Sequence, residues 1–110
     1  MKTPESWKSK AIDLKEFIKY SKASVVSKTL VDKGTGTLTL FSFAKGQGLS
    51  EHTAPYDAVV QVLDGQAELV IGGKPVKTLP GELVIMPANI PHSLRAVTKF
   101  KMLLTMIREK

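Results

Sequence analysis

Short runs of β-branched, aromatic and other apolar residues, separated by turn-forming residues, make up most of the chain after residue 23. Asp64-Gly65 and Gly72-Gly73 each stand between two such runs, and both dipeptides are typical of tight hairpin turns. Many short strands at close spacing favour a sandwich or a barrel. The pattern therefore predicts an all-β domain with strands at 24–31, 35–44, 58–64, 66–72, 75–79, 83–86, 92–97 and 100–107.

A helical pattern occurs near the start of the chain. Leu14, Phe17 and Ile18 recur at helical spacing after Asp13, a residue type that often caps the first turn of a helix. No internal repeat or low-complexity linker divides the rest of the chain. We therefore predict two parts, an N-terminal segment with a short helix at residues 1–23 and a single β-barrel at residues 24–110.

The last predicted strand carries apolar side chains on both of its faces. One face holds Phe100, Met102, Leu104 and Met106, and the other holds Lys101, Leu103, Thr105 and Ile107. A strand of this kind is usually covered on both sides. The second cover is either another subunit, which would make the protein a homodimer, or the N-terminal helix.

Composition and charge exclude several kinds of site. The 110 residues are 43% hydrophobic and 24% charged, as in an ordinary globular domain, and they include no cysteine. Disulfides, thiolate metal ligands and cysteine nucleophiles are therefore excluded. The net charge of +6 comes from lysines interleaved with acidic residues, so we interpret it as a solvated surface and expect no nucleic-acid partner. There is no secretory pattern and no apolar run of about 20 residues, so we expect a cytoplasmic location and no membrane partner.

The two histidines of the chain stand in two frames of fixed spacing. In the first frame, five residues separate Gly46 from His52, and the frame closes at Gly65. The second frame consists of Gly81, Pro87 and His92. These spacings resemble the two motifs of the cupin superfamily, and the resemblance covers nearly half of the chain. It implies a small, single-domain RmlC-like cupin, which is a double-stranded β-barrel of the jelly-roll type.

The resemblance also implies a metal ion held by three histidines and one glutamate, but this chain departs from that pattern. The four corresponding positions read His52, Ala54, Ala58 and His92. The second glycine of the second motif is replaced by Asn89, which we expect to serve the turn, because asparagine tolerates left-handed backbone. Only two of the four ligand positions therefore keep a ligand.

A metal ion at this site would need a third ligand from elsewhere. Bound Zn²⁺ usually has at least three protein ligands, and non-haem Fe(II) sites use two histidines and a carboxylate. A regular strand through His52 directs Glu51 and Asp57 away from the histidine face, unless a bulge at the intervening proline changes the register. Gln47 and Gln61 are the remaining oxygen donors that we consider.

The same alternation predicts which side chains line the pocket. Most of them are apolar, as in a typical small-molecule site. The predicted lining residues are His52, Ala54, Tyr56, Ala58, Val60, His92 and Leu94. We predict that the methionines at positions 86, 102 and 106 fill the core, as methionine usually does.

Three functions remain open at this point. The favoured one is a metal-free pocket that binds a small molecule, with Tyr56 as a third polar group beside His52 and His92. The second is an enzyme of the oxygenase or isomerase type that uses a divalent ion (Fe, Mn, Ni or Zn), with Gln61, water or substrate completing the ligand shell. The third is a regulatory or sensor module that acts through a partner. A fold of this kind does not choose between them.

Overall fold

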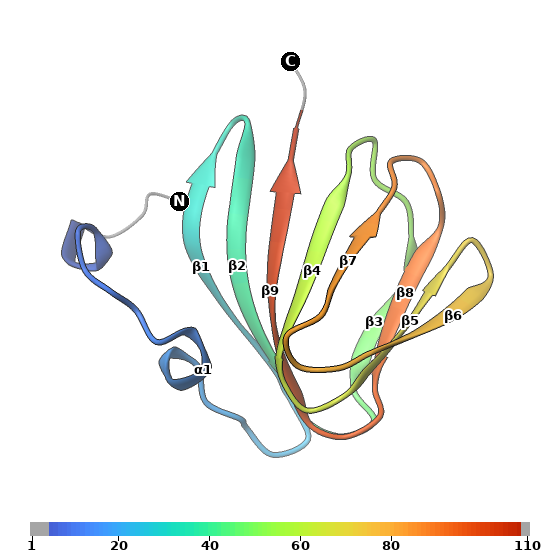
Figure 1. Cartoon of the computed structure of the whole chain (residues 1–110), viewed down its shortest axis with the longest axis horizontal. Helices are drawn as coiled ribbons and strands as arrows, with labels where there is room; N and C mark the ends of the chain where they lie inside the picture. The colour runs from blue at the N-terminus through green and yellow to red at the C-terminus, as the bar shows by residue number, and fades with distance from the viewer. Residues whose placement is uncertain (1–4, 109–110) are drawn as a thin grey trace.

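The computed structural model describes residues 5–108 and shows two antiparallel sheets that enclose a core (Figure 1). The five-stranded sheet has the order β1 (Val25–Lys33), β2 (Gly36–Phe43), β9 (Phe100–Ile107), β4 (Ala58–Asp64) and β7 (Leu83–Met86). The four-stranded sheet has the order β3 (Gly48–His52), β8 (His92–Ala96), β5 (Ala67–Ile71) and β6 (Lys74–Thr78). This arrangement is the predicted all-β jelly roll.

Each of the eight predicted strands is present, and one further strand was missed. The missed strand is β3, which lies in a stretch where the sequence pattern predicts no separate strand. It pairs with β8 in the four-stranded sheet, whereas β4 lies in the five-stranded sheet. The predicted regular strand from His52 onward is therefore wrong, because the chain changes sheets between β3 and β4.

The main core lies between the two sheets and is built from alternate residues of strands in both. Phe43 on β2 and Phe100 on β9 stack with their ring centroids 4.6 Å apart, and both are completely buried. Val60 and Val62 on β4 and Leu69 on β5 belong to the same cluster. Burial of this apolar surface is the main stabilising contribution to such a fold.

Two short helical turns precede the barrel, η1 (Glu5–Trp7) and α1 (Leu14–Phe17). Asp13 occupies the N-cap position of α1, as predicted, but its side chain makes no capping hydrogen bond. The helix is shorter than the pattern suggested, because Ile18 already has extended backbone and turns inward, where it is only 2% exposed.

The N-terminal segment covers part of the outer face of the five-stranded sheet. Ile18 packs in a second apolar cluster with Leu103 of β9 and with residues of β1 and β2. Lys101, the neighbouring outward residue of β9, is buried and donates a hydrogen bond from Nζ to the Lys15 carbonyl at 2.6 Å. The segment thus provides the second cover for this half of β9. Farther along the strand Ile107 is 57% exposed, and the homodimer stays a prediction.

A tyrosine–aspartate hydrogen bond fixes the end of the N-terminal segment to the barrel. Tyr20 Oη donates to Asp64 Oδ2 at 2.5 Å, and Lys15 Nζ lies 3.7 Å from the same carboxylate. The hydrogen bond from Tyr20 is the main cause that holds the pKa of Asp64 below its ordinary value of 3.8. Burial and the same hydrogen bond raise the pKa of Tyr20.

The turn after β4 requires a glycine at position 65. Gly65 has φ +74°, which is the left-handed region. A Cβ atom added there would overlap the Lys99 carbonyl oxygen and lie 2.8 Å from the Phe100 Cα. The closing glycine of the first motif therefore allows the β4–β5 turn to pass close to the start of β9.

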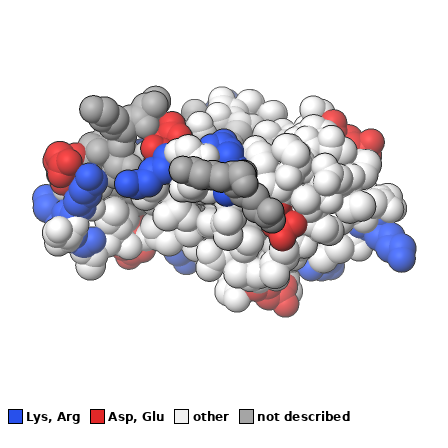
Figure 2. Space-filling model, turned by 90° about the horizontal axis from the view of Figure 1, so that it is seen from above, with Lys and Arg blue, Asp and Glu red and all other residues white. Residues whose placement is uncertain are grey.

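Charged side chains of both signs are interspersed on the face of the molecule seen from above (Figure 2). On the face shown in Figure 2, lysine and arginine side chains form several separate groups, with aspartate and glutamate groups between them. No helix within residues 5–108 is long and apolar enough to cross a membrane. The expectations about nucleic acid and location stay predictions.

Candidate functional site

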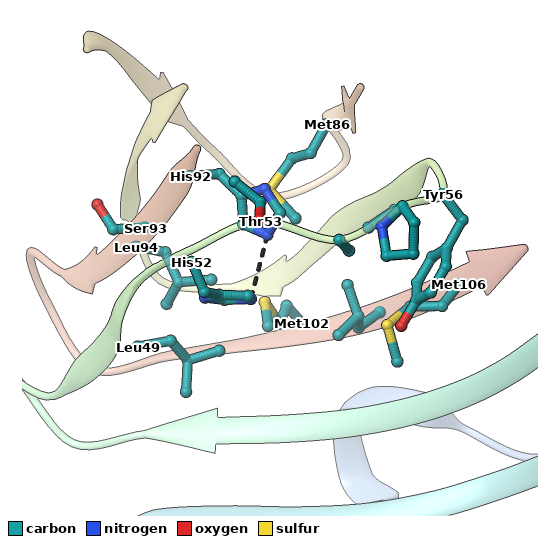
Figure 3. Close-up of a pocket in the computed structure, with 14 residues that line it drawn as sticks. Leu49, His52, Thr53, Tyr56, Met86, His92, Ser93, Leu94, Met102 and Met106 are labelled. Carbon is teal, nitrogen blue, oxygen red and sulfur yellow. Dashed lines mark hydrogen bonds between the residues drawn. The ribbon is translucent and has the colours of Figure 1, made fainter. Parts of the chain in front are cut away.

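A cavity of about 160 Å³ lies between the two sheets, and its wall is mostly apolar (Figure 3). The side chains come from β3, β4, β7, β8 and β9 and from the β3–β4 connection. The lining residues are Leu49, His52, Thr53, Ala54, Pro55, Tyr56, Ala58, Met86, His92, Ser93, Leu94, Met102, Leu104 and Met106.

The β3–β4 connection carries part of this lining and is tied to the loop before β8. The Ala54 carbonyl accepts a hydrogen bond from the Asn89 amide at 2.7 Å, and Asp57 Oδ1 accepts one from the Ala88 amide at 2.9 Å. Asn89 has φ +64°, so the left-handed conformation expected of this asparagine is confirmed. These bonds hold the two motif loops together on one side of the cavity.

The two histidines face each other across a pair of neighbouring strands. His52 on β3 and His92 on β8 are register partners, and their Nε2 atoms lie 3.1 Å apart (Figure 3). Their ring centroids are 4.4 Å apart, with the ring planes inclined by 74°. The pairing of β3 with β8 therefore brings together the two histidines that stand 40 residues apart in the chain.

The hydrogen bonds of the outer ring nitrogens determine the tautomers of this pair. His52 Nδ1 lies 2.8 Å from the Ser50 carbonyl, and His92 Nδ1 lies 3.2 Å from the Ile90 carbonyl. A carbonyl oxygen only accepts, so each Nδ1 carries a hydrogen, and we assign the tautomers from this network. In the neutral rings both Nε2 atoms then present lone pairs to each other. A hydrogen bond between the two Nε2 atoms therefore requires a proton on one of them.

The environments of the two rings differ. His92 is 5% exposed, whereas His52 is exposed. Burial lowers the pKa of His92 below its ordinary value of 6.5, and a positive charge on His52 lowers it further, while the hydrogen bond to the Ile90 carbonyl opposes the shift. The pair therefore resists carrying two positive charges.

Six of the seven side chains predicted to line the pocket do line the cavity, although the strand that carries them is interrupted. Val60 does not, because it lies farther along β4 and is completely buried in the core. Gln61 was predicted as a weak metal ligand and lies on the opposite face of β4, where its register partners are Leu83 and Leu103. Gln47 is also absent from the lining.

The cavity does not fit the divalent metal site that the family resemblance implied. Ala54 and Ala58 line it together with both histidines, so methyl groups stand at the positions of the other two ligands. Glu51 and Asp57 lie outside the lining, as expected. Within the described residues no group of three or more histidine, cysteine, aspartate or glutamate side chains could hold a metal ion. The two histidines therefore lack the third protein ligand that a divalent ion such as Zn²⁺ usually requires.

Sequence reasoning missed several functional groups of the lining. Thr53 adds a hydroxyl group, whereas the hydroxyl of Ser93 is drawn pointing away from the cavity in Figure 3. Met86 and Met102 belong to the main core and Met106 packs against it, as predicted, and all three also line the cavity. Met102 and Met106 stand at alternate positions of β9, on the inward face that the sequence had already indicated. The signal for a methionine-lined wall was therefore present, but methionine at such positions is also the ordinary core residue.

Comparisons with known proteins define the family. Residues 39–108, more than half of the chain, match the model of the cupin domain family. A conserved protein of unknown function from Streptococcus pyogenes is 36% identical in sequence, with a TM-score of 0.89. The match covers 93% of this chain and 90% of that one. A search of curated proteins found no match.

Two further structures are similar. A cupin 2 conserved barrel domain protein from Leptotrichia buccalis is 42% identical, with a TM-score of 0.85 over 88% of this chain, which spans only 47% of that protein. A cupin superfamily protein from Desulfitobacterium hafniense is 24% identical, with a TM-score of 0.88. The match covers 99% of this chain and 97% of that one, and it shows the shared fold. The fold and the two-histidine frame define a small RmlC-like cupin domain. The chain belongs to the cupin family.

Proposed function

We propose that the protein binds a small, largely apolar molecule that places one polar group against the His52–His92 pair. The observation that carries this proposal is the meeting of the two Nε2 atoms, 3.1 Å apart, in the wall of an otherwise apolar cavity. Apolar walls with a few converging polar groups are typical of small-molecule sites. The polar groups fix the orientation of the ligand, and the apolar wall contributes most of the affinity.

The size of the cavity limits the ligand. Its volume is about 160 Å³, and a cavity of about 150 Å³ in another protein binds benzene. A ligand of this site therefore has a body about the size of one aromatic ring or a short branched chain. Tyr56 and Thr53 offer hydroxyl groups in the same lining for a second polar contact.

The other two functions lack a supporting observation. A divalent-metal oxygenase or isomerase needs a further ligand, and the described residues provide no third histidine or carboxylate at the pair. A regulatory or sensor module needs a partner surface, which no feature of the cavity supplies. The binding of a small molecule is therefore the function that we carry forward.

A fragment screen tests the proposal directly. Phenol, benzyl alcohol and benzoate are compared with glycerol and erythritol, which lack an apolar body. Binding is followed by NMR, through the imidazole protons of the two histidines and the methyl groups of the methionines. We expect the aromatic fragments, and not the polyols, to shift the signals of His92 and Met102, both of which line the cavity.

A matched pair of variants shows whether the fragments occupy this cavity. Ala54→Leu fills it and is expected to abolish binding. Ala88→Leu introduces the same side chain in the neighbouring loop, outside the lining, and is expected to leave binding unchanged. The proposal is wrong if no aromatic fragment binds, or if Ala54→Leu binds the fragments as well as the parent protein does.

A further inference from the structure

An arginine stands at the end of the cavity opposite the two histidines. In Figure 3, Tyr56 and Met106 lie at one end of the cavity, and His52 lies at the other. Arg108 follows the end of β9, two residues after Met106, and its guanidinium lies over the Tyr56 ring, with Cζ 5.4 Å from the ring centroid. Tyr56 and Arg108 are both half-buried, so solvent reaches this end of the cavity. Tyr56 therefore connects the apolar wall to a charged group at the rim.

Most N–H donors of the Arg108 guanidinium have no partner among the described residues. The backbone of Arg108 is held in place, since its amide donates to the Thr35 carbonyl at 2.8 Å, and Nη1 donates one long hydrogen bond of 3.4 Å to the Lys33 carbonyl. Within residues 5–108 no aspartate or glutamate forms an ion pair with Arg108. A guanidinium has five N–H donors, and its planar fork matches a carboxylate with two parallel hydrogen bonds. The free donors of Arg108 therefore suit a carboxylate that comes from a ligand.

The Tyr56 hydroxyl is a second unused donor at this end. The hydrogen bond drawn within the cavity lining joins the two histidines, and the Tyr56 hydroxyl has no partner among the lining residues (Figure 3). The lining contains no aspartate or glutamate. The adjacent Asp57 lies outside it, where Oδ1 accepts a hydrogen bond from the Ala88 amide at 2.9 Å. An anionic group beside Tyr56 would therefore meet a hydroxyl donor and a cation, with no carboxylate in the lining to repel it.

We propose that the ligands of this cavity are small carboxylates with an apolar body, and that Arg108 selects them. The carboxylate binds the Arg108 guanidinium and the Tyr56 hydroxyl, while the opposite end of the ligand carries the polar group that meets the histidine pair. The cavity volume of about 160 Å³ limits the body to about one ring. This inference rests on the proposed function, and it adds the charge of the ligand and the residue that recognises that charge.

A matched pair of fragments tests the role of the charge. 4-Hydroxybenzoate and 4-hydroxybenzamide share the ring and the phenol group, and they differ in whether the second substituent is an anion or a neutral amide. Both are titrated into the protein at neutral pH, and calorimetry or NMR gives the dissociation constants. We expect the carboxylate to bind about tenfold more tightly or better, as charge-assisted hydrogen bonds predict. Equal affinities for the two fragments would overturn the inference.

Arginine variants identify the residue that recognises the charge. Arg108→Gln is expected to weaken binding of 4-hydroxybenzoate about tenfold or more and to change binding of the amide less than about twofold. Arg108→Lys keeps the charge but loses the planar fork, so its affinity should be intermediate. The matched control is Arg95→Gln, which removes the same charge at the other arginine of the chain. Arg95 lies outside the lining, 3.6 Å from Glu68, and its variant should bind both fragments as the parent protein does.

The outcomes separate this inference from the proposed function. If Arg108→Gln keeps the preference for the carboxylate, or if Arg95→Gln loses it to the same extent, Arg108 is not the selecting residue and the inference is wrong. If both fragments bind the parent protein equally well, the cavity still binds small molecules, so the proposed function stands and only the inference fails. If neither fragment nor phenol binds, the proposed function fails, and the inference fails with it.

Discussion

Restoring the two missing ligands should convert the cavity into a divalent metal site. The change is the double variant Ala54→His/Ala58→Glu. Both alanines line the cavity with His52 and His92, so the new imidazole and carboxylate would face the two existing Nε2 atoms. Four ligands of this kind satisfy the requirement of Zn²⁺ for three or more protein ligands. We therefore expect the variant, unlike the parent protein, to bind Zn(II) or Ni(II) tightly.

The magnitudes follow from burial and from mass action. Ala58 is 3% exposed, so an unpaired glutamate there is expected to destabilise the metal-free variant by about 2–4 kcal/mol. When the free metal concentration is about a hundred times the dissociation constant, binding adds about 2.7 kcal/mol to the free energy of unfolding. For a domain of this size that corresponds to a rise in Tm of roughly 10 °C or more.

Thermal unfolding with and without Zn(II), together with calorimetric titration, measures both effects. The matched control is Ala54→His/Gln61→Glu, which adds the same two side chains but places the carboxylate on the outer face of β4, near Leu83 and Leu103. The control should bind at least a hundredfold more weakly. The reasoning fails if the folded Ala54→His/Ala58→Glu variant binds no metal, or if the control binds as tightly.

Three further predictions concern the framework that holds the site. Gly65→Ala should lower the free energy of unfolding by about 3 kcal/mol or more, because the position has a positive φ and the new Cβ would overlap the backbone. Gly46→Ala should cost only about 1–2 kcal/mol, because its φ is +86° but no atom lies within 4 Å of the new Cβ. Urea unfolding measures both, and equal losses would contradict the overlap. Tyr20→Phe should cost about 1–2 kcal/mol at neutral pH, near the lower end for a charge-assisted hydrogen bond because the Asp64 side chain is 33% exposed. The folded pKa of Asp64 lies below its ordinary value, so its contribution is present above about pH 3.8 and is lost as the pH falls through the folded pKa. The loss of stability in acid should therefore be smaller in Tyr20→Phe, and an unchanged acid profile would argue against the pairing. Trp7→Ala should destabilise the protein by about 1–3 kcal/mol, because the indole packs edge-on against the helical segment, and a change below 0.5 kcal/mol in the same assay would contradict this contact.

The fold was predictable because its signals are local. Hairpin dipeptides marked the turns, and the period of two marked the inward faces of the strands. The short strand β3 escaped because only one of its five residues is partly buried and the other four are exposed. A strand without a buried face shows no alternation, so its pairing with β8 could be found only from the tertiary structure.

Alternation along a single strand predicted part of the cavity lining, although no single strand carries these residues. Alternation along one strand correctly placed Ala54, Tyr56 and Ala58 beside His52, but the backbone between them connects two sheets. These side chains face the cavity because the connection is tied to the loop before β8. Val60 was misplaced because alternation says which face a residue occupies and not how far along the strand the cavity extends.

The contact between the two imidazoles depends on a glycine that the motif frames left out. Gly48 on β3 lies opposite Arg95 on β8, and a Cβ atom there would overlap the Leu94 carbonyl oxygen. The close approach of β3 to β8 therefore requires glycine at this position. Farther along the same two strands, His52 is the register partner of His92. The spacing of the histidines in the sequence selects the two side chains, but the distance between the strands determines whether their Nε2 atoms can meet in the cavity wall. This distance is a property of backbone packing, and it explains why the sequence identified the residues of the site but not the 3.1 Å gap that defines its chemistry.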